Sequence, residues 1–99
     1  MSNEDKEFYQ RVDKHIDLSN DQIKGGVGRG MASASMMYAT ARFNAWLTAC
    51  SWQNSAELTE SREQSIDYFL AEYRKMLEAN FDDYIANFDT YMGKPQDAE

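Results

Sequence analysis

The sequence predicts an all-α protein: a three-helix bundle with a central apolar helix and a long third helix. Proline, which breaks helices, occurs once among the 99 residues, at Pro95. Only ten residues are Val, Ile or Thr, which favour strands. Apolar residues recur every three or four positions along three segments, the period of an amphipathic helix. We expect one helical domain over residues 1–92 and a disordered acidic tail over residues 93–99.

The first helix is expected to begin near Asn3 or Glu4, with Ser2 or Asn3 as its cap. One apolar stripe follows the helical period, formed by Phe8, Val12, Ile16, Ser19 and Ile23. Four glycines within residues 25–30 are expected to end this helix and to form a loop, because glycine disfavours helix. A second helix is then expected from about Met31 to Ser51.

The second helix has two apolar sides rather than one. One side carries Met36, Phe43, Leu47 and Cys50, and the other carries Ala34, Met37, Ala41, Ala45 and Trp52. A neutral polar strip separates them, formed by Ser33, Thr40, Asn44 and Ser51. Two apolar sides predict contact with two neighbouring helices, so Phe43 and Leu47 are expected in the core.

The third helix is expected to begin between Asn54 and Ser61 and to continue to Met92. Asn54 with Glu57, or Ser61 with Gln64, has the spacing of a capping box. Its last turns contain a seven-residue repeat, residues 79–85 followed by 86–92, typical of a coiled coil. This end either folds back, with a kink near Asn80, or pairs with another subunit. The interface residues in the second case are Phe81, Tyr84, Ile85, Phe88, Tyr91 and Met92.

The charge excludes several classes of function. The net charge is −7 and the isoelectric point about 4.6, which disfavours nucleic acid and anionic membranes as partners. No apolar stretch is long enough to span a membrane, and the first residues lack the pattern of a signal peptide, so a cytoplasmic location is expected. Cys50 is the one cysteine, so no disulfide forms within the chain.

Acids and bases are unevenly distributed along the chain. Residues 22–56 contain three bases and no acid, whereas residues 57–99 contain eleven acids and four bases. The acids near the end of the third helix oppose the helix dipole, which indicates either a cationic partner or ordinary solvation. Those acids are Glu78, Asp82, Asp83 and Asp89.

Two clusters are candidates for binding an anion or a small ligand. Lys24, Gly28, Arg29 and Gly30 precede a helix, where backbone N–H groups can hold an anion, although a simple turn explains the same glycines. Arg42 lies one helical turn from both Tyr38 and Trp46, an arrangement typical of a cation in an aromatic pocket.

The alternative for Arg42 is a buried ion pair with an acid from a neighbouring helix. The acids considered are Asp13, Asp17, Asp67 and Glu72. In that case Arg42→Ala would lower the stability by about 2–4 kcal/mol. No catalytic set, metal site or cofactor is expected, because His15 is the one histidine and has no ligand-like spacing around it.

Two segments resemble known proteins. The first is Arg29–Ala39 with residues 41–45 behind it, and the second is residues 73–84. Both resemble a small proteobacterial family of about this length, classed only as a domain of unknown function, and the similarity extends from about Glu4 to Met92. The resemblance implies a bacterial protein made of this domain alone and supplies no activity or site residue. We therefore expect an interaction or assembly protein, with self-association as one form. The alternative is a small-molecule or anion-binding domain near Arg42.

Overall fold

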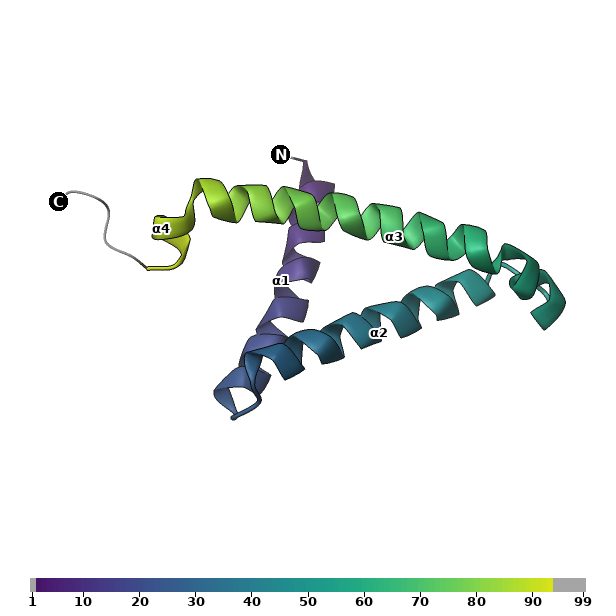
Figure 1. Cartoon of the computed structure of the whole chain (residues 1–99), viewed down its shortest axis with the longest axis horizontal. Helices are drawn as coiled ribbons and strands as arrows, with labels where there is room; N and C mark the ends of the chain where they lie inside the picture. Colours follow the sequence, from purple (N-terminus) through teal and green to yellow (C-terminus); the bar gives the residue numbers. More distant parts are fainter. Residues whose placement is uncertain (1, 94–99) are drawn as a thin grey trace. The chain divides into compact units, whose positions relative to one another are not determined.

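A computed structural model describes residues 2–93 as four helices (Figure 1). They are α1 (Asn3–Lys24), α2 (Arg29–Ala49), α3 (Ser55–Ala86) and the single turn α4 (Phe88–Tyr91). The described residues contain no strand. The predicted all-α fold with three main helices and a long third helix is therefore confirmed. Most of the predicted acidic tail, residues 94–99, lies outside the described residues.

The chain divides into two units, Met1–Leu47 and Thr48–Glu99, which are described separately. In the first unit α1 begins as predicted, because the Ser2 hydroxyl accepts a hydrogen bond of 3.1 Å from the backbone N–H of Asp5. A tight turn closes the helix. The N–H of Gly26 donates to the carbonyl of Ile23, and that of Val27 to the carbonyl of Gln22, both at 3.0 Å.

The start of α2 corrects the predicted boundary. This helix begins at Arg29 rather than Met31, because the Gly28 carbonyl already accepts the N–H of Ala32 at 3.0 Å. Gly30 therefore lies in the first helical turn instead of a loop. Glycine lowers helix propensity by about 1 kcal/mol relative to alanine, which disfavours this helical turn without forbidding it. At its other end α2 stops at Ala49, two residues before the predicted Ser51.

In the second unit Asn54 caps α3, the first of the two predicted boxes. Its side-chain oxygen accepts the N–H of Glu57 at 3.0 Å. The Glu57 carboxylate reaches back to the N–H of Gln53, at 2.7 Å, rather than to that of the cap residue itself. This arrangement satisfies two backbone donors that the start of a helix leaves without partners.

The third helix ends earlier than predicted. It stops at Ala86, and Asn87 separates it from α4, so one helix continuing to Met92 is wrong and the break lies at Asn87 rather than near Asn80. The Asn87 backbone leaves the helical conformation, with φ −122° and ψ 28°. Its side-chain amide donates to the carbonyl and the carboxylate of Asp83, both at 3.0 Å. Such side-chain hydrogen bonds compete with regular helix, here within the repeat itself.

The burial of α2 also differs from the prediction. Ala32, 1% exposed, is the one buried residue among those described, whereas Phe43 and Leu47 are 60% and 50% exposed. Burial in the first unit is concentrated near the α1–α2 turn, where partly buried residues accompany Ala32: Ser19, Gln22, Ile23 and Met36. Farther along α2 the apolar side chains of this unit stay accessible. Among the described residues no helix is long and apolar enough to cross a membrane.

Candidate interaction surfaces

The six predicted interface residues lie together at the C-terminal end of the second unit. We call them the aromatic end: Phe81, Tyr84, Ile85, Phe88, Tyr91 and Met92. All six are exposed, by 48–72% of their surface, with Ile85 the most exposed. α3 carries the first three and the turn α4, with the residue after it, carries the others. Exposed apolar side chains that gather in one place generally mark a contact surface for a partner.

Asp83 holds the two parts of this surface together. Its carboxylate accepts the Asn87 amide and also the Tyr91 hydroxyl, the latter at 3.1 and 3.2 Å to its two oxygens. The ring of Tyr91 contacts that of Tyr84 edge-on, with centroids 4.9 Å apart. We call Asp83, Asn87 and Tyr91 the Asp83 clasp. It attaches the second copy of the repeat to the last turns of α3, instead of continuing the helix axis.

The clasp predicts a titration. The hydrogen bond from Tyr91 to Asp83, and then the charge of Asp83, raise the pKa of Tyr91 above its ordinary value of about 10. Because the neutral hydroxyl is the donor, the clasp is complete below pH about 10 and is lost as the pH rises through the raised pKa of Tyr91. We expect Asp83→Asn to lower the pKa of Tyr91, as measured by carbon NMR of its ring. Asp82→Asn is the matched control, and equal pKa values in both variants would contradict the clasp.

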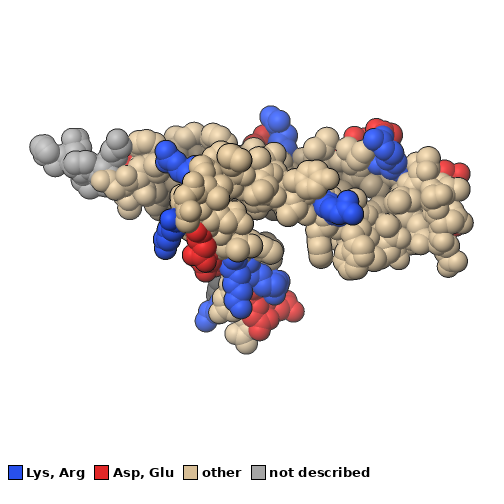
Figure 2. All heavy atoms as spheres, turned by 90° about the horizontal axis from the view of Figure 1, so that it is seen from below, with Lys and Arg blue, Asp and Glu red and all other residues tan. Residues whose placement is uncertain are grey.

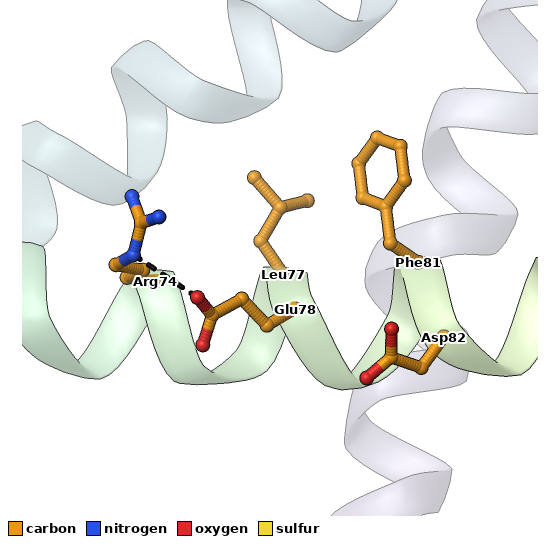
Figure 3. A pocket seen from close by; sticks show the side chains of 5 residues that line it. All are labelled: Arg74, Leu77, Glu78, Phe81 and Asp82. Carbon is orange, nitrogen blue, oxygen red and sulfur yellow. Dashed lines mark hydrogen bonds and ion pairs between the residues drawn. The ribbon is translucent and has the colours of Figure 1, made fainter.

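An open groove runs along α3 beside the aromatic end (Figure 3). It has a volume of about 390 Å³ and is lined by Arg74, Leu77, Glu78, Phe81 and Asp82. Leu77 and Phe81 project from the same side of the helix, and the Arg74 guanidinium pairs with Glu78 at 3.1 Å. The groove thus has one apolar side and one charged edge. The charged edge carries one base and two acids. Arg74 and Leu77 were not among the predicted surface residues, although their spacing from Glu78 and Phe81 is helical.

The residues of the predicted anion site lie close together in the chain. Several backbone N–H groups of the turn before α2 are already engaged in hydrogen bonds with α1. Lys24 ends α1, Arg29 begins α2, and both are exposed. The N–H groups of Gly25, Gly26 and Val27 all donate to carbonyls at the end of α1. Gly28 and Gly30 have open space where a side chain would be. Gly25 and Gly26 therefore serve the turn, whereas Gly28 and Gly30 lie at the start of α2 together with the two exposed cations.

Arg42 does not occupy a buried site. Its side chain is exposed, and it forms no ion pair within the described part of its own unit. Tyr38 and Trp46 are also largely exposed, and Trp46 contacts the ring of Phe43, at 5.2 Å, instead of enclosing the guanidinium. Within its own unit Arg42 is thus exposed to solvent and pairs with neither Asp13 nor Asp17.

This exposure changes the effect expected of Arg42→Ala. Substitutions of exposed residues without special contacts change stability by no more than about 0.5 kcal/mol. We expect the free energy of unfolding of Arg42→Ala, measured by urea denaturation, to lie within that range of the wild-type value. A loss of about 2 kcal/mol or more would instead indicate that Arg42 is buried and paired in solution.

Other candidate residues do not form a chemical site. His15 and Cys50 are both exposed, so the thiol is not the enclosed apolar group that its neighbours predict. Within residues 2–93 no three His, Cys, Asp or Glu side chains are placed to hold a metal ion. Most of the surface seen in Figure 2 is uncharged.

These features define a small all-α protein with exposed apolar faces. Residues 8–85 match the family model described as protein of unknown function (DUF3144), and the chain belongs to this family. The chain is also similar to the protein NB7890A from Shewanella sp, whose structure was determined by NMR. The two are 38% identical, with a TM-score of 0.74 over 87% of this chain and 91% of that one. No curated protein matches. The family resemblance of the sequence is confirmed.

Proposed function

We propose that this protein is a small cytoplasmic bacterial interaction or assembly protein without catalytic activity, and that the aromatic end is its contact surface. One observation carries the proposal: six large apolar side chains, adjacent in the second unit, are all exposed. Burying one side chain of this size contributes about 1.5–3 kcal/mol. A partner that covers several of them therefore gains enough free energy to bind.

The exposed apolar face of α3 supports this proposal. A helix derives most of its stability in a protein from packing of its apolar face rather than from propensity. Along α3 that face includes Leu70, Tyr73, Leu77 and Phe81, all exposed. From α4 the ring of Tyr91 contacts Tyr84. A second protein surface would supply the missing packing.

A ligand-binding or enzymatic role has less support. The groove beside Phe81 is open, whereas small-molecule sites enclose most of their ligand. Arg42, Tyr38 and Trp46 are all exposed, and we identify no arrangement of nucleophile, base and orienting group among the described residues.

The test compares two glutamates introduced into the same helix. Ile85→Glu places a charge within the aromatic end, where the side chain is 72% exposed and folding tolerates the change. Ala71→Glu adds the same charge to an exposed position outside that surface, four residues before Lys75, where it favours helix. Circular dichroism establishes that both variants retain their helices.

Each purified chain is then used as bait in cell extract, and its own mass is followed by light scattering. We expect the wild type and Ala71→Glu to associate alike, either with themselves or with another protein, and Ile85→Glu to lose association by about tenfold or more, as is typical of a charge buried in an apolar interface. Association that is identical in all three chains, or absent from the wild type, would overturn the proposed function.

A further inference from the structure

The charges around the aromatic end indicate what kind of surface covers it. Arg74 neutralises Glu78, and the clasp engages Asp83, but Asp82 and Asp89 have no cation beside them within the described part of the unit. The last turn of α3 contains no base, although the negative end of the helix dipole favours one there. A complementary partner therefore brings cations together with apolar side chains.

The chain itself carries a surface of this chemistry at the α1–α2 turn. Lys24 and Arg29 flank the turn, and the exposed side chains of Val27 and Met31 lie beside them. The first turn of α2 contains no acid, although the positive end of the dipole favours one there. The start of α2 thus lacks the acid that its dipole favours, and the end of α3 lacks the base. The α1–α2 turn carries bases and the aromatic end lies beside acids, so each surface supplies the charge that the other lacks.

α3 is the longest of the helices that the structure describes. α3 has 32 residues, whereas α1 and α2 have 22 and 21. α3 is thus about ten residues, or about 15 Å, longer than either of the other two. This difference equals the length of α3 from Leu77 to Ala86, the segment that carries Phe81, Tyr84 and Ile85 of the aromatic end.

We propose that the aromatic end of one copy docks on the α1–α2 turn of a second copy, with Asp82 and Asp89 facing Lys24 and Arg29 of that copy. This proposal rests on the proposed function and names its partner. Every copy presents both surfaces, and the assembly proposed is the dimer in which each copy contributes both surfaces once. Apolar contact between Phe81 and Ile85 on one side and Val27 and Met31 on the other provides the affinity, and the charges set the register.

Sedimentation of the full chain tests the proposal through a charge exchange. Arg29→Glu and Asp82→Lys each suit the dipole of their own helix, so neither disturbs folding. We expect a wild-type dimer whose dissociation constant rises when NaCl is increased from about 50 mM to about 500 mM. Each single reversal is expected to raise the dissociation constant at low salt about tenfold, and the double variant to return it to within about threefold of the wild type.

Three results would overturn the proposal. They are a monomeric wild type at both salt concentrations, a double variant that binds no better than the single variants, and single reversals that change the melting temperature of a monomer without changing sedimentation. If the wild type is monomeric but still captures another protein through Ile85, the proposed function stands and the second copy is the wrong partner. If no association depends on Ile85, both proposals fail.

Discussion

Gly26→Ala is expected to lower the free energy of unfolding by about 1–2 kcal/mol, the cost of placing an L side chain in a left-handed backbone conformation. Gly26 has φ +110°, and the turn that follows α1 requires this angle. No atom lies within 4 Å of the position a Cβ would take, so the loss arises from the backbone and not from a clash. Without this angle the N–H of Val27 cannot reach the carbonyl of Gln22.

Gly30→Ala is the matched control, because it makes the same change four residues later. Gly30 lies in the first turn of α2, has an ordinary backbone angle and has open space around it. Alanine there is expected to raise the free energy of unfolding by about 0.5–1 kcal/mol through helix propensity. Urea denaturation at one protein concentration and high salt measures both variants. Effects of the same sign would show that the turn does not depend on the Gly26 conformation.

Ala32→Leu is expected to destabilise the protein by about 1–3 kcal/mol, the usual cost of overpacking. Ala32 is the one buried side chain among the described residues, and it lies one turn after the start of α2, where burial in the first unit is concentrated. The added carbon atoms have to displace neighbours near the turn. The readout is the urea midpoint, with circular dichroism as the signal.

Ala34→Leu provides the comparison for this prediction. Ala34 is on the same helix but exposed, and leucine is a good helix former, so a change of no more than about 0.5 kcal/mol is expected. If Ala32→Leu is equally well tolerated, the packing at the α1–α2 turn is loose in solution.

The sequence predicts local structure well because caps depend on residues close in the chain. Ser2 and Asn54 both cap helices as expected, since the donor that each accepts lies three residues away. The predicted start of α2 is too late because the four glycines within residues 25–30 indicate a loop, whereas Gly30 lies in the first turn of the helix. The break at Asn87 was missed because the seven-residue repeat predicts a continuing helix, whereas the amide of Asn87 bonds back to Asp83.

The environment of a side chain could not be predicted in the same way. Periodicity shows which residues share a face of a helix, and it does so correctly for Phe81 and Ile85, but it does not show whether anything covers that face. For this reason Phe43, Leu47 and Arg42 were expected in a core and are exposed. The same limitation applies to the candidate surface: the sequence identifies the aromatic end, but the clasp and the groove depend on how side chains are oriented.

The exposed thiol of Cys50 has a practical consequence for measuring the assembly. Because the sequence contains one cysteine, a spin label or fluorophore attached there modifies each chain at a single known position. In a symmetric pair of chains the two labels yield one distance instead of an overlapping set. Pulsed electron resonance can therefore measure the separation of the two Cys50 positions, without any engineered attachment site.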